Sequence, residues 1–235
     1  MPTGFIFQQL FEHTSSTYTY IIADQSTREA AIIDPVLETH ERDLKLIQEL
    51  KLILKFSLET HLHADHITGS GEMRKALNCQ TAISSEANVE CVDLLLKDGQ
   101  ELSLGKKKIK VLGTPGHTNT CLSFLFEGMI FTGDALLIRG CGRTDFQQGS
   151  SEKLFKSVHE KLFTLPDETL VYPAHDYKGY TSSSVGDEKR LNPRLGGSQS
   201  LESFSKIMSE LKLDNPKKIH EAIPANLACG QKLGP

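Results

Sequence analysis

Four side chains that can bind a metal ion lie within the six positions from His61 to His66. The segment reads Thr60-His61-Leu62-His63-Ala64-Asp65-His66. Imidazole and carboxylate groups that are buried without partners cost several kcal/mol, and a hydrophobic core has no use for so many of them in one short stretch. The cluster therefore predicts a metal-binding site. It leaves open which metal is bound and how many ions there are.

Three further potential ligands follow later in the chain, each close to a glycine or a proline. They are His117 in Pro115-Gly116-His117-Thr118, Asp134 in Thr132-Gly133-Asp134 and His175 in Pro173-Ala174-His175. Each comes after a predicted strand. Loops at strand ends present functional side chains from a rigid scaffold, so we expect these groups to converge on a single pocket.

Hydrophobic periodicity predicts the elements that must position these residues. We expect strands at residues 18–22, 30–35, 53–58 and 169–172 and within 109–137, with a tight turn at Glu127-Gly128. We expect helices at residues 39–51, 70–77, 86–96, 150–163 and 200–212. The strands come in hairpin-like runs. They favour an α/β (α+β) sandwich of two β-sheets with helices on the outer faces over a parallel doubly wound sheet.

The composition excludes several classes of function. The 235 residues carry a net charge of −4 with 38% apolar and 24% charged residues, which is ordinary for a soluble globular protein. The sequence has no basic stripe of the kind that binds nucleic acid. It also has no apolar run that approaches the roughly 18 residues of a membrane span. The five cysteines lack CxxC spacing. Their odd number argues against a disulfide framework and favours a reducing compartment.

The order of these motifs resembles that of the metallo-β-lactamase superfamily. The pattern is His-x-His-x-Asp-His, then Gly116-His117-Thr118, then Gly133-Asp134, and finally His175. The resemblance implies a metallo-β-lactamase-like αββα sandwich of two mixed sheets, with the metal at one edge of the sheets. We expect one domain over residues 1–235, with a C-terminal helical extension from about residue 181.

A longer match narrows the resemblance to the persulfide dioxygenases, the sulfur dioxygenases of the ethylmalonic-encephalopathy protein type. It rests on four segments: Thr60–Gly71, Gly133–Gln147, Tyr172–Tyr177 and Leu191–Arg194. Members bind one Fe(II) per chain and oxidise glutathione persulfide with O2 and water to sulfite and glutathione, in sulfide detoxification. The resemblance places the catalytic iron ligands at His61, His117 and Asp134. Two imidazoles and one carboxylate are what non-haem Fe(II) oxygenases use.

The other four groups, His63, Asp65, His66 and His175, can be interpreted in two ways. Their spacing fits two alternatives equally well: ligands of a second metal ion, or a hydrogen-bonding network around the first metal ion. In the hydrolases of the superfamily they complete a two-zinc site. The resemblance to the dioxygenases implies that the second site stays vacant and that these residues orient the ligands of the first.

Candidate substrate-binding residues come from the loops that follow Asp134. Arg143 and Arg139 are candidates to pair with the carboxylates of the tripeptide, because arginine binds carboxylates bidentately. A structural bond within a loop is the alternative for Arg139. The resemblance adds Tyr177 and Arg194 as glutathione contacts. We expect no nucleic-acid or membrane partner, and the sequence leaves a homodimer open.

The main alternative is a dinuclear-zinc glutathione thioester hydrolase of the glyoxalase II class. That class shares the Gly140-Cys141-Gly142-Arg143 stretch, but the following Thr144–Gly149 departs from its pattern, and the polar tail is short for its helical domain. A metal or sulfide sensor would need an effector module, which the sequence does not suggest. The absence of a charged leader favours a bacterial cytoplasmic enzyme. A trimmed eukaryotic protein would belong in the mitochondrial matrix.

Overall fold

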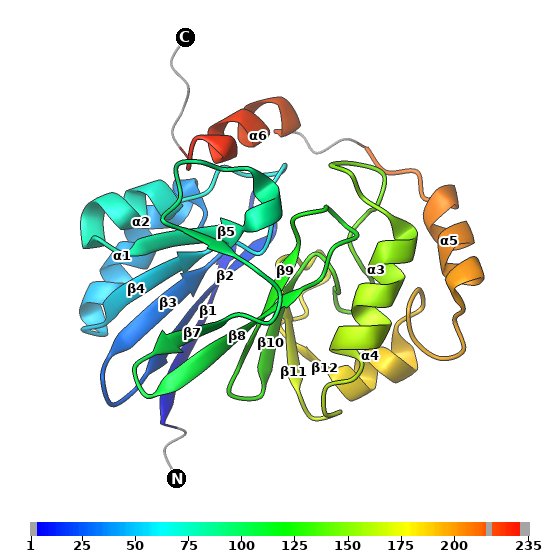
Figure 1. The fold of residues 1–235 in the computed structure, drawn as a ribbon, viewed down its shortest axis with the longest axis horizontal. Helices are drawn as coiled ribbons and strands as arrows, with labels where there is room; N and C mark the ends of the chain where they lie inside the picture. The colour runs from blue at the N-terminus through cyan, green and yellow to red at the C-terminus, as the bar shows by residue number, and fades with distance from the viewer. Residues whose placement is uncertain (1–3, 215–217, 231–235) are drawn as a thin grey trace. The chain divides into compact units, whose positions relative to one another are not determined.

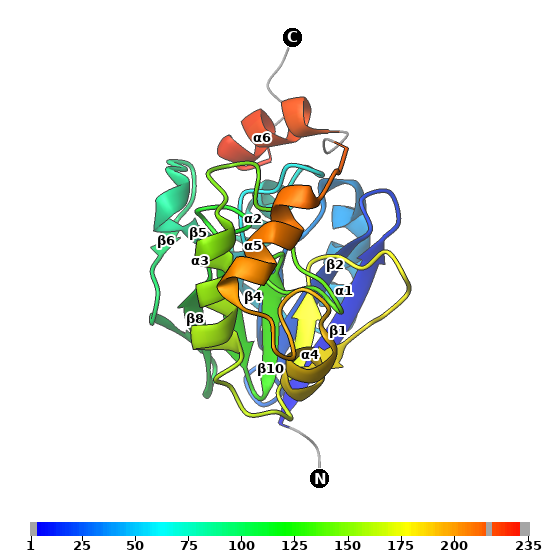
Figure 2. The same cartoon turned by 90° about the vertical axis from the view of Figure 1, so that its right-hand side faces the viewer.

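The computed structural model describes residues 4–214 and 218–230 of the chain. They form two mixed β-sheets of six strands each, together with helices (Figures 1 and 2). By their contacts these residues divide into two compact units. Unit 1 contains residues 4–96, 101–109 and 218–230, and unit 2 contains residues 97–100 and 110–214. None of the described helices is long and apolar enough to cross a membrane.

The first sheet lies within unit 1 and has the strand order β1-β2-β3-β4-β5-β6. Neighbours from β1 to β3 are antiparallel and neighbours from β3 to β6 are parallel. The strands are β1 (Phe5–Glu12), β2 (Thr17–Asp24), β3 (Glu29–Ile33), β4 (Ile53–Leu58), β5 (Gln80–Ser84) and β6 (Leu94–Leu96).

Helices α1 (His40–Glu49) and α2 (Ser70–Leu77) connect the parallel strands and cover one face of this sheet (Figure 1). Ile47 of α1 and Met73 of α2 are buried in one apolar cluster with Ile21 and Ile32 of the sheet. Parallel strands need such crossover connections. A single 3-10 turn follows each of two strands, at Leu37–Thr39 after β3 and at Ser85–Ala87 after β5.

The adjacent ends of β3 and β4 determine where polar side chains leave this sheet. Ile33 pairs with Leu58, and the N–H of Asp34 donates to the carbonyl of Leu58 at 2.9 Å. Asp34 and Glu59 therefore follow the carboxyl ends of two parallel neighbours at the same sheet edge. Ligand sites of open α/β sheets lie at this edge.

The second sheet has the order β12-β11-β10-β9-β8-β7. Its strands are β7 (Glu101–Leu104), β8 (Lys107–Gly113), β9 (Leu122–Phe126), β10 (Met129–Gly133), β11 (Leu170–Pro173) and β12 (Ser183–Ser184). Strands β10 and β11 are parallel, with Gly133 opposite Pro173. Asp134 and His175 therefore both emerge just beyond the same edge, as Asp34 and Glu59 do in the first sheet.

The helices of unit 2 pack on one apolar cluster that includes strands β10 and β11. They are α3 (Ser151–Ser157), the π-helical turn Val158–Leu162, α4 (Val185–Leu191) and α5 (Leu201–Glu210). Leu154, Val185 and Phe204 of these helices are fully buried with Ile130 and Val171 of the strands. Helices α3 and α5 lie side by side in both views (Figures 1 and 2), and the rings of Phe155 and Phe204 meet there.

Most of the predicted elements are confirmed. Glu127 and Gly128 both have positive φ, 48° and 78°, as a two-residue hairpin turn requires. The predicted helix at 86–96 is wrong. Asn88 ends the 3-10 turn at Ser85–Ala87 in a left-handed conformation, and Leu94–Leu96 pairs with β5 instead. The sequence also missed α4 and α6 (Ile219–Leu227), which lie in the polar tail.

The sequence argued against a disulfide framework, but the fold contains one disulfide that the sequence did not predict. Cys91 and Cys229 form a disulfide across 138 residues of sequence. The other three cysteines, Cys79, Cys121 and Cys141, are buried and lie outside this disulfide. An odd cysteine count excludes complete pairing but does not exclude one bridge between two cysteines that the fold brings together.

We expect the Cys91–Cys229 disulfide to stabilise the protein, because it closes a long loop in the unfolded chain. Replacing both cysteines by serine should lower the free energy of unfolding by about 2–4 kcal/mol. Urea denaturation of the oxidised proteins measures the difference. A thiol reductant should bring the wild type to the stability of the double variant and leave that variant unchanged. Equal stability of the wild type with and without reductant would contradict the prediction.

Candidate metal centre

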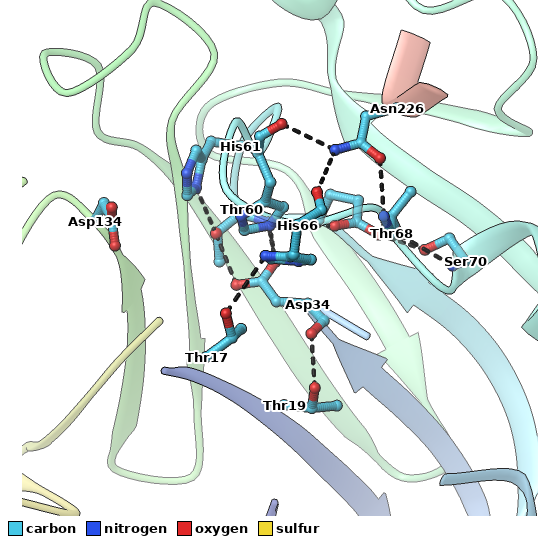
Figure 3. Close-up of polar contacts among 12 residues, drawn as sticks. Thr17, Thr19, Asp34, Thr60, His61, His66, Thr68, Ser70, Asp134 and Asn226 are labelled. Atoms are coloured by element: carbon cyan, nitrogen blue, oxygen red, sulfur yellow. Dashed lines mark hydrogen bonds and ion pairs between the residues drawn. The ribbon is translucent and has the colours of Figure 1, made fainter. Parts of the chain in front are cut away.

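The histidine segment begins where β4 ends, and a hydrogen-bond relay fixes its first histidine (Figure 3). The hydroxyl of Thr60 donates to Asp34 Oδ2 at 2.8 Å and lies 3.0 Å from His61 Nδ1. Because the hydroxyl proton is used by Asp34, the hydroxyl oxygen accepts from the ring, so Nδ1 of His61 carries the proton. Nε2 is then the lone-pair nitrogen, and such outer partners are what orient a metal-binding imidazole.

Asp34 accepts both hydrogen bonds of Thr60 in this relay, and no sequence motif predicted a role for it. Its other oxygen accepts the N–H of Thr60 at 2.7 Å. Its backbone is left-handed, with φ of 50°, a conformation in which aspartate is enriched among non-glycine residues. The residue is 1% exposed. Its only sequence signal is its position, in an Asp-Pro pair that directly follows a buried strand.

His63 is held by two carboxylates on one side of its ring. Its Nε2 lies 3.2 Å from Asp34 Oδ1 and 3.3 Å from Glu59 Oε2. Burial lowers the pKa of His63, but the charges and hydrogen bonds of Asp34 and Glu59 outweigh it and hold the pKa well above its usual value. Glu59 also accepts short hydrogen bonds from the hydroxyls of Thr68 and Ser70, so it ties both ends of the segment together.

Two buried ring nitrogens of this segment have no hydrogen-bond partner among the described residues. They are Nδ1 of His63 and Nε2 of His66. The opposite nitrogen of each ring is engaged, since His66 Nδ1 lies 3.0 Å from Asp65 Oδ2. Ligand atoms of His63, Asp65 and His66 lie within 4.8 Å of one another. Buried nitrogens without partners in such a group fit a metal ion, which is the chemistry that the segment predicted.

In unit 2 a second set of donors surrounds the carboxylate of Asp134. His117 Nε2 lies 3.5 Å from Asp134 Oδ2, and His175 Nε2 lies 3.8 Å from Asp134 Oδ1. The Nδ1–H of His117 donates to the carbonyl of Arg143 at 2.7 Å, which leaves Nε2 as its lone-pair nitrogen. Asp134 thus presents one oxygen to each imidazole, and its Oδ1 is buried without a hydrogen bond within the described part of the chain.

Two glycines allow the backbone to approach these donors closely. A Cβ on Gly142 would lie 2.6 Å from the carbonyl oxygen of Asp134 and 2.8 Å from the ring of His117. Gly116 has φ of 144°, and a Cβ there would collide with the backbone of Leu154. The glycine before His117 and the glycine before Arg143 are therefore required by packing around the donors.

The four candidate substrate residues lie in unit 2, and each of them contacts another residue of that unit. The guanidinium of Arg139 pairs with the fully buried Glu188, which is the structural bond left open by the sequence. Arg143 bonds both oxygens of Asp145 at 2.6 and 2.7 Å. Arg194 donates to the carbonyl of Cys141 at 3.0 Å. Tyr177 is 72% exposed, and its ring stacks on that of His175.

Comparison with known proteins places these motifs in a family. The chain belongs to the metallo-beta-lactamase superfamily, whose model matches residues 14–175. Within the superfamily, the chain is 51% identical to the mitochondrial persulfide dioxygenase ETHE1 of Homo sapiens, over 96% of this chain and 89% of that protein. The resemblance that the motifs predicted is confirmed.

A solved structure and a more distant relative complete the comparison. The crystal structure of ETHE1 from Myxococcus xanthus matches with a TM-score of 0.93 and 51% identity, over 96% of this chain and 100% of that one. Glyoxylase B2 of Dictyostelium discoideum is 30% identical over 94% of this chain and 89% of that protein. The predicted fold class, two mixed sheets with helices in the metallo-beta-lactamase fold, is confirmed, and the family together with its histidine and aspartate donors supports metal binding.

Proposed function

We propose that this chain is an iron-dependent persulfide dioxygenase that converts glutathione persulfide, O2 and water to glutathione and sulfite. The observation that carries the proposal is the 51% identity to a persulfide dioxygenase over 96% of the chain. The reaction inserts both atoms of O2 and one oxygen of water into the terminal sulfur. It is balanced when two protons are released with the sulfite dianion.

We assign the iron to His61, His117 and Asp134. This assignment is supported by the donor types, since two imidazoles and a carboxylate are the facial ligands of non-haem Fe(II) oxygenases. It is also supported by the partners that fix each ring, Thr60 for His61 and the Arg143 carbonyl for His117. Iron held there would supply open coordination positions for the persulfide sulfur and O2. The protein's own part is to orient the donors and to exclude other ligands.

We assign His63, Asp65, His66 and His175 to a second metal position that stays vacant in the dioxygenase. We make this assignment because the chain resembles the persulfide dioxygenases, and Asp34 and Glu59 hold Nε2 of His63 within the network at 3.2 and 3.3 Å. In this role the four residues form a polar network around the iron. A dinuclear-zinc hydrolase would instead need all four as ligands.

For the substrate we propose Tyr177 and Arg143 as the leading contacts of glutathione. Tyr177 offers an exposed ring beside His175. The backbone carbonyl of Arg143 accepts the Nδ1–H of His117. Substrate binding to the Arg143 guanidinium would therefore act one residue away from a proposed metal ligand. Arg194, whose guanidinium donates to the Cys141 carbonyl, is a further candidate. Arg139 has the structural role set by Glu188.

The relatives support the dioxygenase over the glyoxalase II-like hydrolase. Persulfide dioxygenases match at 51% identity, whereas the glyoxylase matches at 30%. The named mammalian relatives are mitochondrial. A bacterial cytoplasm or a mitochondrial matrix is the location that we propose for an enzyme of this type, with a homodimer as the oligomer to test.

Metal content and oxygen consumption test the proposed function together. The purified protein should contain about one iron per chain and consume O2 when glutathione persulfide is added, with sulfite as the product. Reduced glutathione alone is the matched control and should cause no uptake. Two zinc ions per chain, hydrolysis of S-lactoylglutathione and no O2 uptake would establish the hydrolase instead.

A further inference from the structure

A single asparagine from the C-terminal helix binds the backbone of the histidine segment at three points (Figure 3). Asn226 of α6 accepts the N–H of Thr68 at 2.8 Å through its side-chain oxygen. Its amide nitrogen donates to the carbonyls of His63 and His66, both at 2.9 Å. The side chain is 5% exposed. All four residues lie in unit 1, although about 160 positions separate Asn226 from the others.

The chemistry of these contacts selects an amide. An N–H faces the side-chain oxygen and two carbonyls face the side-chain nitrogen, so the group must accept at one end and donate twice at the other. Aspartate is the same size but would place an oxygen against two carbonyl oxygens. Alanine would leave two buried carbonyls and one buried N–H without their partner.

The histidine segment depends on such contacts because it has no regular secondary structure. Between β4 and α2 its backbone is irregular and mostly buried, and buried backbone groups must find partners outside a helix or sheet. Asn226 supplies three of them in one side chain. The carbonyls that it holds belong to His63 and His66, the residues on either side of Asp65.

Helix α6 is itself fastened to this segment. Ala222 and Ala225 are buried against Ile67 and Leu37. A Cβ on Gly230 would collide with the carbonyl of Thr68, so the chain beyond the helix also touches the segment. The Cys91–Cys229 disulfide anchors the same end of the helix. Asn226 is therefore held from several sides and cannot simply follow a movement of the loop.

We propose that Asn226 is a positioning residue of the metal centre, through which α6 holds the backbone of residues 61–68 in its ligand-presenting conformation. The proposal rests on the proposed function only in taking His61 of that segment as a ligand. Asn226 does not touch a metal or a substrate. It acts through the backbone of His63, His66 and Thr68.

Hydrogen exchange in the metal-free protein tests the contact without depending on activity. Asn226→Ala should speed exchange of the Thr68 amide at least about tenfold relative to the rest of unit 1, and Asn226→Asp should do so to a similar degree or more. Co(II) binding in competition with a chelator should weaken about 10–100-fold, the range seen when an outer partner of a ligand is lost. The visible spectrum of the bound Co(II) should change as its ligands become disordered.

Two control variants separate positioning from general destabilisation. Glu221→Gln exchanges a carboxylate for an amide on an exposed position of the same helix and should change nothing. Ile47→Ala removes a buried side chain from the core of unit 1, in a different apolar cluster from Ile67 of the segment, and should lower the melting temperature. It should leave Thr68 exchange, measured relative to the rest of unit 1, and the Co(II) spectrum as in the wild type.

Each outcome decides for or against the inference. Equal weakening of Co(II) binding in Ile47→Ala and Asn226→Ala would overturn it, as would wild-type exchange and affinity in Asn226→Ala. If Asn226→Ala fails to fold, Asn226→Ser provides the same readouts, since its shorter hydroxyl cannot span all three groups. A wild type without dioxygenase activity would refute the proposed function, while the exchange and Co(II) measurements would still decide the role of Asn226.

Discussion

His117→Ala is expected to lose iron and dioxygenase activity together, while His175→Ala retains most of its iron. His117 presents a lone-pair nitrogen whose tautomer is fixed by the Arg143 carbonyl, and we assign it to the iron. Losing a direct ligand should reduce activity by more than the roughly 100-fold that an outer partner is worth. His175 belongs to the position that we propose to be vacant, so its loss should disturb mainly the orientation of Asp134.

Iron analysis of the purified variants, after equal exposure to a chelator, measures this difference. Thermal unfolding of both variants in their metal-free forms should stay close to that of the metal-free wild type, which would show that the loss is one of ligation. If His175→Ala is stripped of metal as thoroughly as His117→Ala, the second position is occupied and the two-metal interpretation gains support.

Among the single substitutions proposed outside the metal centre, Glu188→Ala is expected to cause the largest loss in the free energy of unfolding. Glu188 is 0% exposed and accepts from the backbone N–H of Arg139 at 3.0 Å, from Ser183 at 2.6 Å and from Asn192 at 2.9 Å. It also pairs with the Arg139 guanidinium. Removing one partner of a buried ion pair leaves the other charge uncompensated, and this typically costs about 3–5 kcal/mol.

Chemical denaturation of Glu188→Ala against the wild type measures this loss. Glu152→Ala is the matched control, because Glu152 pairs with Lys156 on the surface of α3 and should contribute little. Glu188→Gln should fall between the two, since it retains the shape and several hydrogen bonds but not the charge. A Glu188→Ala protein as stable as Glu152→Ala would show that the buried pair contributes nothing.

The donors could be predicted from the sequence because each is a local event at a strand end. His117, Asp134 and His175 each follow an apolar strand and a glycine or proline. The residue types and their order along the chain are therefore enough to predict them. The same reasoning predicted the Glu127-Gly128 hairpin, whose two residues both need a positive φ. Short-range steric rules act between residues that are adjacent in the chain, so their effect can be predicted from adjacent residue types.

The groups that hold those donors could not be predicted in this way. Asp34 meets Thr60 across 26 positions and Asn226 meets Thr68 across 158. Neither residue is unusual among its own neighbours. The failed helix at 86–96 has the same origin, since its leucines gain more by pairing with β5 than by local helix formation. What the sequence hides is which distant residues the fold brings together.

Cys141 is a buried thiol although glycines flank it on both sides, and it is 4% exposed. Burial raises the pKa of its thiol to about 11, so little thiolate exists near neutral pH. The residue is a small apolar group beside Met208.

The position of Asn226 near the end of the chain also determines when the centre can form during synthesis. The histidine segment is complete once Thr68 has been made, but 158 more residues must be added before Asn226 exists. At about 5–20 residues per second this interval is about 8–30 s. During that time the nascent histidines carry no support from α6. If Asn226 positions the centre as we propose, we expect stable loading with metal to follow the translation of the C-terminal helix.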